Sequence, residues 1–193
     1  MKHFIVGPVE MYQCTKDIYK NDYFYFRTNE FGSMVKNSLK RMSKLLGNSV
    51  ENSLIYLTAS GSAAMEAVIE NCIAPEDKSL VINGGTFGKR FCQLLNFHSA
   101  QYDSIDLTFG EMLTEKHLTK FDNKGYTTLF INLHETSTGQ LYDIKMISDF
   151  CKRNNMLLIV DAISTFLADE YDMEKYGIDV TIISSQKGLC LSP

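Results

Sequence analysis

With 193 residues, of which 45% are hydrophobic, the chain is long enough to bury the core of one globular domain. Its net charge is -4 and no block of like charges occurs, so charge gives no case for binding to nucleic acid or to an anionic membrane. The function is therefore expected to come from a local site.

The five cysteines are scattered and follow no metal-binding spacing: Cys14, Cys72, Cys92, Cys151 and Cys190. This pattern predicts a reducing compartment, the cytoplasm, and no metal site. The apolar part of the N-terminus is too short for a signal peptide, and no run approaches the length of a membrane span. We expect a soluble protein.

The first 28 residues read as an N-terminal arm. Gly7-Pro8 indicates a turn, and the aromatic residues that follow are expected to cover an apolar surface of this chain or of a partner subunit. They are Tyr19, Tyr23, Phe24, Tyr25 and Phe26. From Asn29 the apolar residues recur at helical spacing, and Gly47 is placed to end the helix. We therefore divide the chain into an arm, residues 1–28, and a layered domain, residues 29–193.

Leu54 to Thr58 reads as a strand, and Ser60-Gly61-Ser62 leads from it into a helix. Such a turn leaves backbone N–H groups free at the positive end of the helix dipole, which suits a phosphate. The same residues also suit an ordinary N-cap, which is the commoner use of serine there. The turn contains neither the dinucleotide-binding glycine pattern nor a Walker loop.

The middle of the chain continues the alternation of strands and helices. Strands are expected at 79–83, 101–107 and 127–133, and helices up to about 97, at 111–118 and from 143 to about 153. Phe87, in a glycine-rich turn after the first of these strands, is either core or a stacking platform for a flat ring. Thr136 lies in HETSTG, whose hydroxyls either bind a ligand oxygen or satisfy the loop backbone. His134 at its start is more often a structural group than a base.

Two apolar runs near the end are typical of neighbouring strands in a buried parallel sheet. The first, 157–160, stops on Asp161, and the second, 180–183, stops shortly before Lys187. Alone, Asp161 reads as a helix cap and Lys187 as a solvated loop charge. Together at one sheet edge they suit pyridoxal phosphate, which needs an amine for its aldehyde and a carboxylate for its pyridinium nitrogen. The elements predict an α/β fold in three layers, a mostly parallel sheet with helices on both faces.

Seven segments, in this order, resemble the class V branch of the fold-type I pyridoxal-phosphate aminotransferases, which includes the alanine–glyoxylate, serine–glyoxylate and 2-aminoethylphosphonate–pyruvate transaminases. They read GPV, FRTNEF, ASGSAAME, NGGTFGKRF, HETSTG, VDAISTF and SSQKG. The resemblance implies that Lys187 forms a Schiff base with the cofactor. It also implies that Gln186, together with Ser60, Gly61 and Ser62, holds the phosphate.

The remaining roles also follow from the resemblance. Asp161 pairs with the pyridinium nitrogen, and Thr136 bonds the phenolic oxygen of the cofactor. Phe87 stacks on one face of the ring, where the family commonly has Trp or His, and Ile163 packs on the other face. The segment Gly7-Pro8 is expected near the substrate.

The resemblance implies a transaminase that moves an amino group from a small amino acid or aminophosphonate to a 2-keto acid such as pyruvate or glyoxylate, working as a homodimer. Subunits of this family are nearly twice as long, and carry a small C-terminal domain and an Arg for the substrate carboxylate. Both are expected to be absent from this chain, in which Arg27 is the substitute that the sequence offers. Two alternatives stay open: a lyase or desulfurase of the same fold, and a truncated non-catalytic cofactor-binding domain.

Overall fold

The structure is a computed structural model that describes residues 5–22, 25–50 and 53–193. Two aromatic residues of the predicted arm, Tyr23 and Phe24, lie outside the described residues. Among those that are described, no helix is long and apolar enough to cross a bilayer.

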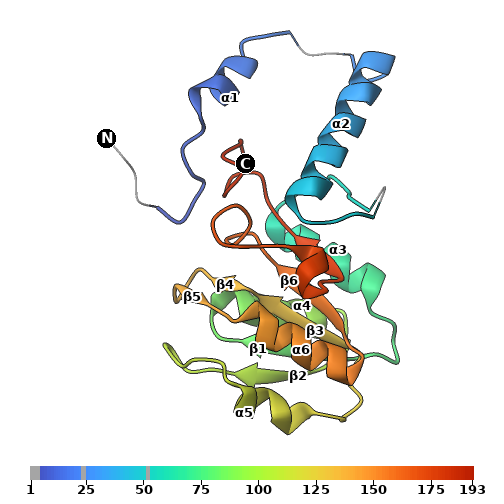
Figure 1. The fold of residues 1–193 in the computed structure, drawn as a ribbon, viewed down its shortest axis with the longest axis vertical. Coiled ribbons are helices and arrows are strands. Elements are labelled where there is room, and N and C mark those ends of the chain that lie inside the picture. The colour runs from blue at the N-terminus through green and yellow to red at the C-terminus, as the bar shows by residue number, and fades with distance from the viewer. Residues whose placement is uncertain (1–4, 23–24, 51–52) are drawn as a thin grey trace.

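Five parallel strands form the central sheet, in the order β2-β1-β3-β6-β7 (Figure 1). Their bounds are β1 Lys78–Asn83, β2 Gln101–Asp106, β3 Thr128–Asn132, β6 Leu157–Asp161 and β7 Val180–Ile182. The chain passes from β1 to β2 on one side and then returns to place β3 on the other side of β1. A ligand site in an open α/β sheet is expected at the carboxyl ends of the strands beside such a reversal. The predicted parallel sheet is confirmed.

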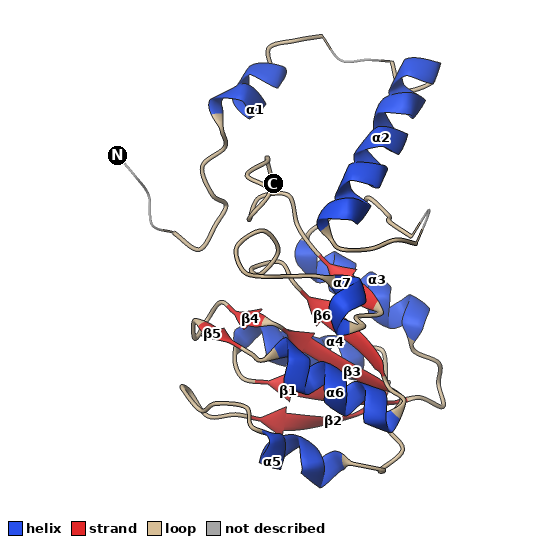
Figure 2. Cartoon of the chain, in the orientation of Figure 1, coloured by secondary structure: helices blue, strands red, loops and turns tan. Residues whose placement is uncertain are grey.

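Helices cover both faces of the sheet (Figure 2). Helices α3, Gly61–Cys72, and α4, Thr86–Phe97, pack on one face, against strand residues such as Val81 and Phe130. Helix α6, Ile144–Asn154, packs on the other face, against Leu80 and Ile131, together with the short helices α5, Glu115–Leu118, and α7, Met173–Tyr176. Because successive strand residues point to opposite faces, the unbroken apolar runs of the sequence fill both layers at once.

Helix α6 forms where the sequence predicts it. Asp143 caps it by accepting the backbone N–H groups of Lys145 and Met146 at 2.9 and 3.2 Å. Its inward residues Ile147, Phe150 and Cys151 are buried, and Asn155 ends it in the left-handed conformation, φ 54°.

The first two helices lie at one end of the molecule, away from the sheet (Figure 1). Helix α1 of the N-terminal arm, Gln13–Ile18, and the following α2, Asn29–Leu45, contain no buried residue. The predicted helix from Asn29 is confirmed, and Gly47 follows its end with φ 66°. The described aromatic residues of the arm, Tyr19, Tyr25 and Phe26, are exposed and do not cover an apolar surface of this chain, so contact with a partner subunit stays a prediction.

Two local predictions fail. Leu54 to Thr58 is not a strand but an extended loop with Ile55 79% exposed, because no described strand pairs with it. The helix expected from Glu111 begins only at Glu115. The side chain of Glu111 instead accepts the N–H of Thr108 at 2.9 Å, which closes a turn before the helix, and a 3-10 turn, Thr119–Phe121, follows it. The structure also adds a small antiparallel hairpin, β4 His134–Glu135 with β5 Gln140–Leu141.

Candidate active site

The nine predicted site residues line one pocket of about 240 Å³ at the carboxyl edge of the sheet. They are Ser60, Gly61, Ser62, Phe87, Thr136, Asp161, Ile163, Gln186 and Lys187. Each ends a strand, follows a strand or opens a helix, so residues that are distant in sequence meet because all the strands of the central sheet run the same way. What each side chain does there stays a prediction.

One corner of the pocket is the N-terminus of α3. The Ser60 hydroxyl caps the helix by accepting the N–H of Ala63 at 3.2 Å, so the ordinary N-cap interpretation is realised. The first-turn N–H groups of Gly61 and Ser62 have no acceptor within the helix, and they stand at the positive end of its dipole. A Cβ on Gly61 would lie 2.6 Å from Cδ1 of Ile163, so a glycine lets the helix start approach that side chain.

Asp161 is the buried acid of the pocket, with no exposed surface. Burial raises its pKa to about 6, although hydrogen bonds from the N–H of Ile163 and from Asn132 oppose that rise. Glu135 adds to the rise and the charge of Lys187 lowers the pKa. Near neutral pH the carboxylate is therefore ionised, and a cationic ring nitrogen would meet an opposite charge there.

Lys187 lies in the loop after β7. The N-terminal residues from Val6 to Val9 run alongside this lysine and contact it. Its Nζ donates to the carbonyl of Val6, and the N–H of Val9 donates to the carbonyl of Gln186 at 2.9 Å. A Cβ on Gly7 would lie 2.8 Å from Cδ of Lys187. The segment Gly7-Pro8 thus lies beside the amine of Lys187, in the pocket where the resemblance leads us to expect it.

Phe87 is held at its place by Glu135. The Glu135 side chain is buried and accepts the backbone N–H groups of Phe87 and Gly88 at 3.1 and 3.0 Å, at the start of α4. It also accepts the hydroxyl of Ser137 at 2.7 Å. This carboxylate joins the glycine-rich turn to the HETSTG loop and places a negative charge where the helix dipole favours one.

A second, larger pocket of about 500 Å³ adjoins the first, and the two share Thr136, Ser164 and Lys187. The Thr136 and Ser164 hydroxyls are hydrogen-bonded at 2.6 Å. His134 lines the larger pocket, with Nδ1 2.8 Å from Asp169. The interpretation of His134 as a satisfied structural group agrees with that contact.

Sequence reasoning missed four polar residues of the site. Asn132 and Ser184 line the smaller pocket, and Asn132 Oδ1 and Ser184 Oγ are buried without a hydrogen-bond partner among the described residues. Ser164 and Glu135 are the others. A signal existed for Asn132, because a polar residue closing an apolar strand beside Asp161 should share its sheet edge. No pattern marked Ser164 or Ser184.

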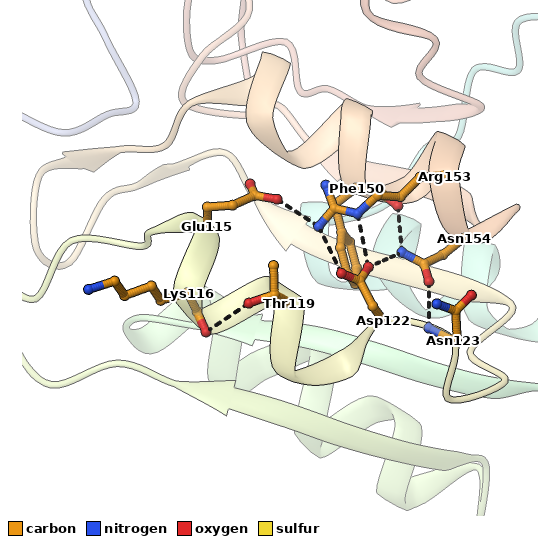
Figure 3. Close-up of polar contacts among 8 residues, drawn as sticks. All are labelled: Glu115, Lys116, Thr119, Asp122, Asn123, Phe150, Arg153 and Asn154. Carbon is orange, nitrogen blue, oxygen red and sulfur yellow. Dashed lines mark hydrogen bonds and ion pairs between the residues drawn. The ribbon is translucent and has the colours of Figure 1, made fainter.

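No arginine of the described residues lines either pocket. Arg27 is exposed and lies over the ring of Phe26, so the expectation that it substitutes for a substrate-binding Arg has no contact to support it. Arg153 bonds Asp122 at 2.9 Å and Glu115 at 2.7 Å, in a polar cluster that ties the end of α6 to α5 and the 3-10 turn (Figure 3). Both pockets therefore lack a guanidinium.

Comparison with known proteins places these features in a family. Residues 20–193 match the family described as Aminotransferase class-V. An uncharacterized aminotransferase of Methanocaldococcus jannaschii is 32% identical over 86% of this chain and 43% of its own length. The 2-aminoethylphosphonate–pyruvate transaminase of Phocaeicola vulgatus is 30% identical over 71% of this chain and 38% of its own.

The fold has the same neighbours. The crystal structure of an alanine–glyoxylate aminotransferase from Nostoc sp. superposes with a TM-score of 0.89 at 25% identity, over 97% of this chain and 50% of that one. The chain spans half or less of the length of each of these relatives.

Proposed function

The chain belongs to the class-V aminotransferase family, and from this membership we propose that it provides the cofactor-binding part of a pyridoxal-phosphate-dependent transaminase. The amino donor would be a small amino acid or aminophosphonate, and the acceptor a 2-keto acid such as pyruvate or glyoxylate. The observation that carries the proposal is the single pocket in which a buried acid, a lysine, a helix N-terminus and two apolar side chains meet.

The residues present fit the cofactor. The free N–H groups of Gly61 and Ser62 suit a phosphate, and the buried carboxylate of Asp161 suits a cationic ring nitrogen. Asn132 Oδ1 and Ser184 Oγ have no hydrogen-bond partner in the part of the chain that the structure describes, so this pocket holds polar atoms that a ligand could satisfy. Phe87 and Ile163 offer apolar surface for a flat ring.

Lys187 and Asp161 divide the chemistry between them. When bound, the cofactor supplies an aldehyde for exchange of amines and a ring that withdraws electrons from the substrate Cα. The Nζ of Lys187 is an amine that lies in the pocket. Once it is no longer bonded to the cofactor, it can take the proton from the substrate Cα as a general base. Asp161, ionised above about pH 6, provides the fixed negative charge. In the structure, the Nζ of Lys187 donates a hydrogen bond to the carbonyl of Val6.

The finer assignments rest on the resemblance. We propose residues 1–28 as an arm and 29–193 as the large cofactor-binding domain, a homodimer as the working form, and the cytoplasm as the location. A lyase or desulfurase of the same fold is the alternative for the reaction, and a non-catalytic cofactor-binding domain is the alternative to an enzyme.

The test is a half-reaction. The protein is loaded with pyridoxal phosphate, and alanine, serine, aspartate, 2-aminoethylphosphonate and cysteine are added separately at rising concentrations. Loss of the visible absorbance band together with one equivalent of the matching carbonyl product, a 2-keto acid from an amino acid or an aldehyde from 2-aminoethylphosphonate, supports the transaminase. Sulfide release from cysteine with the visible absorbance band retained would favour the lyase or desulfurase, because neither reaction leaves the amino group on the cofactor, and a bound cofactor that no donor converts would favour the non-catalytic domain.

A further inference from the structure

Asn132 closes β3 directly beside Asp161, which closes β6. The two residues are paired in the parallel register, and their side chains are 2% and 0% exposed. The Nδ2 group of Asn132 donates to Oδ2 of Asp161 at 2.9 Å. The other oxygen, Oδ1, accepts the N–H of Ile163 at 2.9 Å. Among the described residues, each carboxylate oxygen therefore has one donor, and Asn132 supplies the side-chain donor.

The surroundings of Asp161 make its charged form depend on the hydrogen bond from Asn132. Burial raises the pKa of Asp161 and Glu135 adds to the effect, whereas Lys187 and the two hydrogen bonds oppose it. Tyr171 also faces the carboxylate: burial raises the pKa of Tyr171, and the charge of Asp161 adds to that rise. Loss of the Asn132 donor would leave an oxygen of a buried charge unpaired, which favours the protonated acid.

The amide of Asn132 is fixed in one orientation. Reversing it would put Oδ1 against the carboxylate of Asp161. In the present orientation Oδ1 is buried and has no donor among the described residues. A buried acceptor without a partner destabilises a fold, so folding alone does not explain an asparagine here.

We propose that Asn132 is a positioning residue, whose side chain fixes the direction of the Asp161 carboxylate and keeps it ionised for the pyridine nitrogen of the cofactor. The last clause rests on the proposed function, while the pairing of Asn132 with Asp161 does not. Asn132 itself takes no part in the exchange of amines.

The first experiment uses the protein without cofactor. Carboxyl ¹³C NMR follows the titration of Asp161, with its signal assigned from the Asp161→Asn variant. Asn132→Leu, of similar volume, should raise the titration midpoint by about one unit, a tenfold change in proton affinity. Thr128→Val is the matched control, because Thr128 lies at the other end of β3, is buried, and also has an unpartnered oxygen. It should leave the midpoint unchanged.

Asn132→Asp gives a second route if the leucine variant folds poorly. It keeps the shape of the side chain but replaces the donor by an acid, so two neighbouring carboxyls would share a proton and Asp161 should again titrate higher. An Asp161 midpoint that stays at the wild-type value in both variants would overturn the proposal.

The second experiment measures the dissociation constant of pyridoxal phosphate from absorbance between pH 5 and 8. Asn132→Leu should weaken binding about tenfold at pH 5, because Asp161 must lose its proton to pair with the cofactor and holds that proton more tightly in the variant; the difference should disappear toward pH 8, where both proteins carry an ionised Asp161. A purely structural defect would weaken binding equally at every pH and would overturn the role. If the midpoint shifts as expected but the wild-type protein binds no cofactor, the proposed function fails and the pairing stands.

Discussion

The carboxylate of Glu135 bonds the backbone of Phe87 at 3.1 Å and thereby fixes an aromatic side chain from a loop that lies 48 positions further along the chain. It also spares the first N–H groups of α4 from being left without acceptors, although Gly85 at the N-cap has no side chain to serve them.

Glu135→Gln should therefore weaken both the fold and the pocket. The amide would turn an N–H₂ toward groups that are themselves donors, and charge-assisted bonds would be lost, so we expect a loss of about 2 kcal/mol in the free energy of unfolding. Urea denaturation measures it, with the exposed Glu76→Gln as the control. Equal stability of the two variants would contradict this account.

Lys187 should carry the cofactor. Borohydride reduction of the loaded protein followed by peptide mapping should place the pyridoxyl group on Lys187. Lys187→Ala should abolish the adduct, while Lys89→Ala should retain it, because Lys89 is an exposed residue of α4 that lines neither pocket. An adduct on Lys89 in the wild-type protein would refute the assignment.

Because Asp161 is buried, the free energy of unfolding should fall as the pH rises and this carboxyl loses its proton. Its pKa of about 6 lies above the ordinary value of 3.8, so the folded chain holds a proton that the unfolded chain has released between those values. The stability from that proton is complete below about pH 4 and is lost by about pH 6, a change of roughly 3 kcal/mol. Without cofactor, Asp161→Asn should thus be more stable than the wild type at pH 7.5 and similar at pH 4. Parallel pH curves of unfolding free energy would show that the carboxylate is not buried.

Asp161→Asn should also slow the reaction, although it makes the cofactor-free protein more stable at pH 7.5. Asparagine supplies no negative charge to the ring nitrogen, so removal of the Cα proton should slow by orders of magnitude. Single-turnover absorbance measurements in a complete enzyme of this family with the variant check the point. Near-normal turnover there would make Asp161 a helix cap and nothing more.

Gly61→Ala should disturb the pocket more than the fold. The added methyl would meet Cδ1 of Ile163, the movable end of that side chain, so the change in unfolding free energy should stay small while Ile163 is pushed toward the cofactor space. We expect weaker binding of pyridoxal phosphate, measured by absorbance titration. Ile163→Val removes Cδ1, and the double variant should recover part of the loss; no recovery would contradict the steric explanation.

Amino donors should bind weakly to the 193-residue chain, because no arginine lines either pocket among the described residues. A bidentate Arg is the most effective partner for a carboxylate. The rate of the half-reaction should therefore rise in proportion to donor concentration, and Arg27→Ala should not change it. Saturation with any donor below about 1 mM, an ordinary enzyme value, would show that the described residues suffice for substrate binding.

The sequence predicted most of the sheet because its strands are buried on both faces and read as unbroken apolar runs, as Leu157 to Asp161 does. It also predicted which strand ends carry polar side chains, since parallel strands bring those ends to one edge. Leu54 to Thr58 has the same apolar character, yet it forms no strand because pairing is a property of neighbours and not of the segment. The predicted helix start at Glu111 is wrong for a related reason. The side chain of Glu111 accepts a local hydrogen bond from the backbone N–H of Thr108, and this turn replaces the first turn of the helix.

Within the site, the residues that could be predicted are those whose chemistry is distinctive. Lysine, aspartate and a small-residue helix start each suggest a use. Asn132 and Ser184 gain their significance only from what lies beside them, and that depends on strand register and loop geometry. The hydrogen bond from Lys187 to the carbonyl of Val6 joins the two ends of the chain, so no local sequence pattern could predict it.

The order of the strands has a consequence for how the protein folds. The pocket is closed by Lys187, which follows the sheet-edge strand β7, whereas its other wall begins at Ser60. Pairing of such distant segments is slow, because the entropy of closing long loops is lost before the contacts form. A chain in which β7 has not yet joined β6 has no complete pocket, so pyridoxal phosphate should not speed refolding. It should instead slow unfolding, by binding only the state in which the last strand is in place.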